Sequence, residues 1–202
     1  MDYTNRTYEE IDRWLKNNLN EKRYIHSIGV MECAIELAKK FGLNENKALI
    51  AGLLHDCAKC FSNEHLLEII NTKIKNVNKS ELLNYKTLHA PVSAYIAKNE
   101  FGVEDEEVLS AIRWHTLGKL QMSDFEKIIF LADKIEAKTR PSEYRAQILE
   151  ILEKENGLNL ALLKCFSETI KSLVKRELPI CHLTIDVFNE LLDCTKETNI
   201  IK

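Results

Sequence analysis

Apolar residues recur every three to four positions along almost the whole chain, which is the spacing of one buried face of an α-helix. Between Tyr24 and Ala38, for example, the apolar stripe runs through Ile28, Met31 and Ile35. Six Gly and three Pro interrupt the chain, and no alternating run is long enough to predict a strand. The periodicity therefore predicts an all-α protein built as a helical bundle.

Capping signals divide this pattern into separate helices. Thr7-x-x-Glu10 and Ser123-x-x-Glu126 have the form of capping boxes, in which side chains at both ends of the first turn bond to backbone N–H groups. The helices are expected over about 8–19, 22–41, 47–58, 63–71, 91–100, 104–115, 123–136, 142–154, 158–176 and 185–194, with a short turn near 80–84.

Single residues mark other helix ends. Gly42 fits a C-cap, Ser62 fits an N-cap, and Thr184 is expected to open the last helix. Pro91 fits the first position of a helix, where its missing N–H has no cost. Residues 47–58 are apolar nearly all round, so this helix is predicted to be buried at the centre of the protein.

Length and composition indicate one ordinary globular domain. The chain has 202 residues, 45% of them hydrophobic and 29% charged, without internal repeats or a low-complexity linker. A net charge of −3 gives no general attraction to nucleic acid or anionic membranes. No apolar run reaches the roughly 18–20 residues that a membrane span needs, and the acidic N-terminus does not resemble a signal peptide. A cytoplasmic location is therefore expected.

The six cysteines do not predict a disulfide framework. They are expected to be reduced thiols in a chain of this kind. Cys57-x-x-Cys60 supplies half of a structural zinc site, and no second pair completes it. We interpret both residues as passive.

Two carboxylates fall within strongly apolar segments. Asp56 follows Leu-Leu-His55, and Asp133 follows Ile-Ile-Phe-Leu-Ala. An unpaired buried carboxylate costs several kcal/mol, so each needs a cation. Pairing with Arg or Lys elsewhere in the chain is one explanation. A metal ion is the simpler one, because His55 adjoins Asp56 and other histidines lie in helical contexts.

Three histidines strengthen the metal interpretation, and two others do not. His26, His89 and His115 lie in predicted helices or at their ends. His65 is in a polar helix and is expected at the surface, and His182 is expected in a loop after a proline.

At this point the chain resembles a known family. The order His26, His55-Asp56, Asp133 is that of the HD-domain metal-dependent phosphohydrolases. The surrounding words make the resemblance more specific: RYIHSIGVMECAIELAKKFG, AGLLHDCAK, LHAPVSAYIAKNEFG, AIRWHTLGK and FLADKIEAKTRP. They are similar to the motifs of the bacterial YqeK-type family of symmetrical bis(5′-nucleosyl)-tetraphosphatases.

The resemblance implies a fold and an activity. It implies one HD domain over 1–202, with an HD core over about 20–140 and C-terminal helices over 142–195 that complete the bundle. It also implies metal-dependent hydrolysis of diadenosine tetraphosphate to two ADP.

The resemblance further implies a ligand set. His26, His55, Asp56 and Asp133 would hold a divalent metal, with iron favoured by the family and manganese next by ligand chemistry. His89 and His115 match additional family histidines. They would hold either a second metal or a substrate phosphate, so one or two ions remain open.

A net-negative chain needs local cations to bind a polyphosphate. Arg23 precedes the first ligand, and Lys59 and Arg140 follow ligand segments, so these three are expected to bind substrate. Thr116 and Gly118 come just after a site histidine, and Gly118 would permit close approach of the backbone to a phosphate.

One late segment, 177–182, resembles the family's loop near the nucleoside. Its candidate nucleoside contacts are Leu178, Ile180, Cys181 and His182. We expect backbone contacts to the base rather than side-chain specificity.

Other interpretations remain at this stage. The same HD core could act on a dNTP, a guanosine polyphosphate or a cyclic nucleotide. A non-catalytic helical module that keeps a metal for stability is a second interpretation, and a homodimer is left open. A nucleic-acid-binding domain is not expected, because the basic balance it needs is missing.

Overall fold

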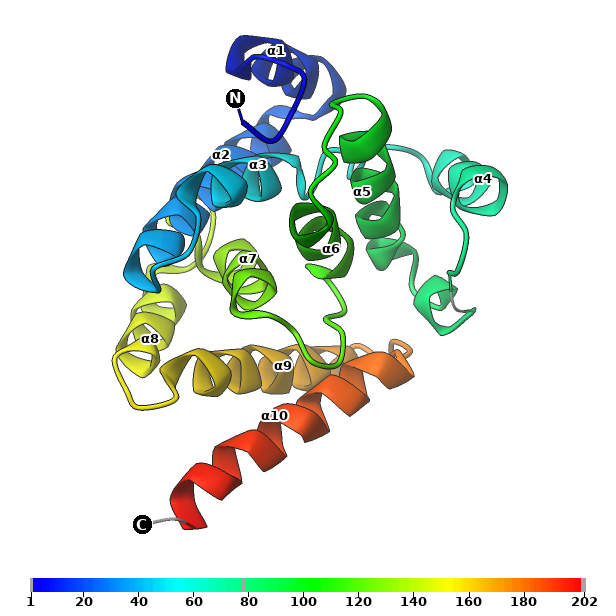
Figure 1. Ribbon diagram of the computed structural model, residues 1–202. Helices are drawn as coiled ribbons and strands as arrows, with labels where there is room; N and C mark the ends of the chain where they lie inside the picture. Colours follow the sequence, from blue (N-terminus) through cyan, green and yellow to red (C-terminus); the bar gives the residue numbers. More distant parts are fainter. Residues whose placement is uncertain (1, 78, 201–202) are drawn as a thin grey trace.

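All regular structure in the described residues, 2–77 and 79–200 of the computed structural model, is helical (Figure 1). The helices are α1 (Tyr8–Asn18), α2 (Glu21–Lys40), α3 (Glu45–Leu54), α4 (Asn63–Lys73), η1 (Lys79–Leu82), η2 (Tyr85–Thr87), α5 (His89–Asn99), α6 (Glu106–Trp114), α7 (Asp124–Ile135), α8 (Ser142–Leu152), α9 (Gly157–Lys175) and α10 (His182–Ile200). The predicted all-α class is confirmed.

The predicted caps of three helices are present. Both capping boxes form: Thr7 accepts the Glu10 N–H while Glu10 accepts the Thr7 N–H, and Ser123 and Glu126 repeat the arrangement at α7. Ser62 caps α4 through its side-chain oxygen. These local bonds satisfy N–H groups that a helix leaves without partners, which explains why the polar signals located the helix starts.

Two predicted helix starts are wrong by a few residues. Helix α5 begins at His89, so Pro91 is its third residue, where proline is still tolerated because the first N–H groups need no intrahelical partner. Helix α10 begins at His182 rather than after Thr184. His182 is therefore the first residue of a helix and not part of a loop.

The predicted helix 47–58 ends earlier than expected. Helix α3 stops at Leu54, and backbone N–H groups of Cys57 and Lys59 bond three residues back instead of four. Cys57 Sγ and the Ala58 N–H are bonded to Ser93 of α5, which holds this turn in place. His55 and Asp56 thus lie in a tight turn just beyond the helix, not inside it.

Helix α7 lies at the centre of the bundle. It packs against α2, α3, α6, α8 and α9 (Figure 1). Its residues from Ile128 to Asp133 are all buried, as are residues 50–54 of α3. The sequence predicted that the helix over 47–58 forms the buried centre of the protein. In the structure, α3 and α7 form this centre together. None of the helices in the described residues is long and apolar enough to cross a membrane.

Gly52 permits the close contact between α2 and α3. A Cβ atom at this position would lie 2.7 Å from Met31 Cα and 3.0 Å from Met31 N, both backbone atoms that cannot rotate away. The two helices therefore approach as closely as they do because residue 52 has no side chain.

Replacing Gly52 with alanine is predicted to destabilise the protein by about 1–3 kcal/mol, the usual cost of forcing an added methyl group into a packed core. Urea unfolding followed by circular dichroism measures the change. Gly42→Ala is the contrasting variant, because Gly42 has φ +66 with open space around it and tests backbone strain alone. A Gly52→Ala protein as stable as the parent would show that α2 and α3 separate at no cost.

Candidate metal centre

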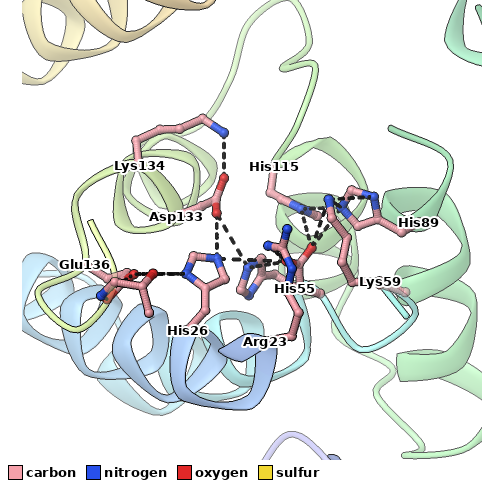
Figure 2. A network of polar contacts seen from close by, with 12 residues as sticks. Arg23, His26, His55, Lys59, His89, His115, Asp133, Lys134 and Glu136 are labelled. Carbon is pink, nitrogen blue, oxygen red and sulfur yellow. Dashed lines mark hydrogen bonds and ion pairs between the residues drawn. The ribbon is translucent and has the colours of Figure 1, made fainter. Parts of the chain in front are cut away.

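Five elements bring side chains from their ends or inner faces into one buried cluster (Figure 2). His26 comes from α2, His55 from the turn after α3, His89 from the start of α5, His115 from the residue after α6, and Asp133 from the last turn of α7. Asp56 follows His55 in the same turn. All six predicted core and additional histidine or carboxylate positions are therefore buried together.

His55 has its ring orientation set by the helix it follows. Its Nδ1–H donates to the Gly52 carbonyl at 2.7 Å, one of the last-turn carbonyls that α3 leaves without a helical partner. Its Nε2 is buried and has no hydrogen-bond partner among the described residues. Burial lowers the pKa of His55 to about 3, so the ring is neutral and Nε2 carries a lone pair.

His115 repeats this arrangement at the end of α6. Its Nδ1–H donates to the Ile112 carbonyl at 2.7 Å, again three residues back. The Nε2 lone pair then lies 3.1 Å from His89 Nε2 and 3.5 Å from Asp56 Oδ1. Burial lowers the pKa of His89 to about 4, which keeps that ring neutral as well.

His26 is oriented by a carboxylate. Its Nδ1–H donates to Glu136 Oε1 at 3.0 Å, and its Nε2 lies 2.9 Å from Asp133 Oδ1. With one proton committed to Glu136, a neutral ring presents its lone pair to a negatively charged oxygen. A cation is needed between these two atoms, and it is either a second proton on the ring or a metal ion.

Asp56 links two halves of the cluster. Its Oδ1 lies 2.9 Å from His89 Nε2, and its Oδ2 lies 3.7 Å from His55 Nε2 and 3.9 Å from His26 Nε2. Ligand atoms of His26, His55 and Asp56 are all within 4.8 Å of one another, and so are those of Asp56, His89 and His115. One carboxylate therefore faces two sets of imidazoles with its two oxygens.

This donor set fits a divalent first-row metal. Imidazole nitrogens with free lone pairs and carboxylate oxygens are the ligands that iron, manganese and similar ions take in proteins. The orphaned His55 Nε2 supports the fit, because a buried nitrogen without a partner is otherwise unfavourable. Cys57 and Cys60 play no part in the described cluster: Cys57 Sγ bonds the Ser93 carbonyl, and Cys60 is exposed.

Four cationic side chains surround the two carboxylates (Figure 2). Arg23 lies 3.3 Å and Lys59 3.8 Å from Asp56. On the other side, Lys134 lies 2.5 Å and Arg140 2.8 Å from Asp133. Each of the four cations therefore lies beside a carboxylate of the cluster.

The cations also set the ionisation of the site. Burial alone would raise the pKa of Asp133, but the charge of Lys134, the hydrogen bond with His26 and the charge of Arg140 hold it well below its ordinary value. Burial lowers the pKa of Lys59, whose Nζ also lies 3.1 Å from both ring nitrogens of His89.

Thr116 and Gly118 are the other substrate contacts that the sequence predicted near His115. Thr116 is adjacent to the cluster in sequence, and its Oγ1 is buried without a partner among the described residues. Gly118 has φ +71 and a Cβ there would lie 2.6 Å from Phe166 Cζ, so packing against α9 already explains this glycine. Arg113, two residues before His115, bonds Glu81 at 2.9 Å.

The predicted nucleoside segment is not tied to the cluster. Among the described residues, no hydrogen bond or ion pair joins Leu178, Ile180, Cys181 or His182 to the metal-facing side chains. Cys181 is buried, and His182 is exposed at the start of α10. A nucleoside role for these residues stays a prediction.

Glu136 is the site residue that sequence reasoning missed. It is fully buried, and it accepts hydrogen bonds from the Lys138 and Thr139 N–H groups and from the Thr139 hydroxyl. Gly29 leaves room for it, because a Cβ there would collide with Glu136 Oε2. Its spacing three residues after Asp133 was the available signal, since that places both on one helical face.

The helical fold and the cluster of histidines and carboxylates are of the HD type, and comparison with known proteins agrees. Residues 23–138 match the HD domain family, and the chain belongs to that family. Within it, the chain belongs with the YqeK-type proteins named symmetrical bis(5′-nucleosyl)-tetraphosphatase. One from Halalkalibacterium halodurans is 40% identical over 88% of this chain and 93% of its own length, and one from Bacillus subtilis is 38% identical over 91% and 97%.

A solved structure is similar throughout. A Clostridium acetobutylicum protein, described as a predicted HD superfamily hydrolase involved in NAD metabolism, superimposes with a TM-score of 0.87 at 38% identity. The match covers 93% of this chain and 98% of the other. The helical arrangement is therefore that of an HD superfamily hydrolase.

Replacing Glu136 with glutamine is predicted to weaken metal binding by about 10- to 100-fold, the usual effect of losing the partner that orients a ligating histidine. The metal content of protein dialysed against graded chelator measures the affinity. Glu153→Gln, at an exposed ion pair with Lys40, is the matched control. Unchanged affinity in Glu136→Gln would mean that His26 needs no help from this carboxylate.

Proposed function

We propose that this protein hydrolyses diadenosine tetraphosphate symmetrically to two ADP. The observation that supports the substrate most directly is the match along nearly the whole chain to proteins of that name, at 38–40% identity. The cluster of imidazoles and carboxylates supports metal-dependent phosphate chemistry independently of those names.

We infer that the centre would hold two divalent ions and that Asp56 would help to hold both. His26, His55 and Asp133 would complete one site, and His89 and His115 the other. The inference rests on the two oxygens of Asp56 facing different imidazoles. Iron is the first choice, on family resemblance, and manganese the next, on ligand chemistry. When bound, such ions supply Lewis-acid polarisation of a phosphoryl oxygen and activation of a water molecule.

The four cations of the site would bind the tetraphosphate. With metal bound, the charges of Asp56 and Asp133 would be neutralised. The side chains that now pair with these carboxylates would then be free to contact phosphate oxygens; they are Arg23, Lys59, Lys134 and Arg140. The two arginines present flat donor groups for bidentate contacts, and the two lysines act as point charges. Their positions on both sides of the cluster suit a chain of phosphates laid across it.

In the reaction, water adds to one inner phosphorus, and the bond between this same phosphorus and the oxygen that bridges to the other inner phosphorus breaks. Water gives up a proton, and the bridging oxygen leaves with the other half of the substrate. Each half of the substrate leaves as ADP. Lys59, held against His89 and Asp56, would neutralise negative charge on the leaving oxygen. The buried Thr116 hydroxyl, which has no partner in the described residues, would donate to a phosphate oxygen.

A different nucleotide is the remaining alternative. The same centre could cleave a dNTP, a guanosine polyphosphate or a cyclic nucleotide, since metal ligands do not select the base. Because the Clostridium protein is described as involved in NAD metabolism, NAD is a further compound to test. A cytoplasmic location and a homodimer stay predictions.

Metal-loaded protein is predicted to convert diadenosine tetraphosphate to ADP alone, and a chelator is expected to abolish the reaction. Chromatography of the products, with a dNTP, a guanosine polyphosphate, a cyclic nucleotide and NAD assayed alongside, makes the test. Asp133→Ala should remove both metal and activity. Formation of AMP and ATP would place the cleavage between an outer and an inner phosphorus and contradict the symmetrical reaction.

Elemental analysis of saturated protein is predicted to find two ions per chain. A His89→Ala/His115→Ala double variant should keep one ion. Asp56→Ala should bind metal weakly at both sites, because it removes the shared carboxylate. His65→Ala is the control, since the His65 side chain is exposed on α4 and contacts Glu68 and Phe61, which are not part of the cluster. Saturation at one ion in both the parent and the double variant would rule out the second site.

A further inference from the structure

A pocket of about 480 Å³ lies outside the metal centre. It is bounded by α5, α6 and residues 73–76 at the end of α4. Helices α5 and α6 lie side by side in Figure 1. Neither His89 nor His115 lines it, although they belong to the ends of these helices. Arg113 does, two residues before His115 and so on a different side of the helix.

The pocket combines an aromatic wall with an apolar floor. Tyr95 and Trp114 contribute flat rings, and Pro91 and Leu109 contribute buried apolar surface. Its volume falls within the roughly 300–1,000 Å³ of small-molecule sites. This half of the pocket suits a planar aromatic group such as a nucleobase.

The rim of the pocket is positively charged. Lys73, Lys75, Lys98 and Arg113 face one acidic residue, Glu106. This is a local excess of positive charge in a chain whose net charge is −3. Such an excess attracts an anion that carries several charges.

Two of these cations are available to a ligand. Lys73 and Lys75 are exposed and make no ion pair with any described residue. Lys98 pairs with Glu106 at 3.3 Å, but both side chains are exposed, so the pair is weak and exchangeable. Arg113 is held by Glu81 and stacks over Trp114 at 4.7 Å, which makes that wall rigid.

We propose that this pocket binds a nucleotide at a second site, separate from the metal centre. The base lies against Tyr95 and Trp114, and the phosphates lie against Lys73, Lys75 and Lys98. The proposal does not depend on the reaction at the metal centre, because no lining residue is a proposed metal ligand.

Trp114 provides a direct report of binding. The chain has two tryptophans, and the other, Trp14, lies on α1 with its ring 5.3 Å from that of Phe101. A Trp14→Phe protein therefore fluoresces from Trp114 alone. Metal-loaded Trp14→Phe protein is titrated with ADP, and equilibrium dialysis counts the ADP bound per chain.

In this background, Lys73→Glu/Lys75→Glu is expected to weaken the ADP affinity measured from Trp114 quenching by about tenfold or more, because two favourable charges become repulsive. Equilibrium dialysis should then count one ADP fewer per chain. Hydrolysis at the metal centre should be unchanged. Lys39→Glu/Lys175→Glu makes the same charge change at exposed lysines elsewhere and should alter the quench less than about twofold. An unaltered quench and count in Lys73→Glu/Lys75→Glu overturn the proposal.

Inorganic tripolyphosphate separates a nucleotide site from a plain phosphate site. Tyr95→Ala is expected to weaken the affinity for ADP by about tenfold. The affinity for tripolyphosphate should change by less than about twofold. Equal effects on both ligands would show that the base makes no contact and would overturn the nucleotide assignment. Because hydrolysis is measured separately, failure here is distinct from failure of the proposed reaction.

Discussion

The structure depends on two carboxylates, Asp56 and Asp133, held inside the bundle among imidazole lone pairs. Buried negative charge is costly unless cations or hydrogen-bond donors compensate it. The imidazole rings increase the need for a cation, because their Nε2 atoms present lone pairs to the carboxylates. The Nδ1–H groups of His26, His55 and His115 each donate to another acceptor. Arg23, Lys59, Lys134 and Arg140 offset the carboxylate charges, but the imidazole lone pairs still face the carboxylate oxygens, and a metal ion is a group that would satisfy both.

Helix ends make this arrangement possible. The last carbonyls of a helix have no partner within it, and those of Gly52 in α3 and Ile112 in α6 are used to orient His55 and His115. The third ring, His26, lies within α2, and Glu136, the residue that follows α7, orients it instead. The close packing of α2 on α3, permitted by Gly52, then places His26 beside His55.

The sequence was sufficient for the class of fold and for the candidate ligands, because both leave local signals. Apolar periodicity revealed the helices, and capping boxes at Thr7 and Ser123 located two of their starts. Asp133 stood out as a charge in an apolar run. Tertiary bonds leave no such signal: the turn after Leu54 depends on Ser93, which lies on α5, and the space for Glu136 depends on Gly29. Glu136 could have been predicted from its position three residues after Asp133.

The distribution of charge explains how an acidic chain can be suited to anionic ligands. A net charge of −3 argues against binding an extended polyanion, since that requires a continuous basic surface. A nucleotide needs only a few cations in one place. Around the metal centre these cations are paired with carboxylates that a metal would neutralise, so their attraction for phosphate would depend on metal loading. At the outer pocket, Lys73 and Lys75 carry no such pairing among the described residues, so binding there would not require the metal.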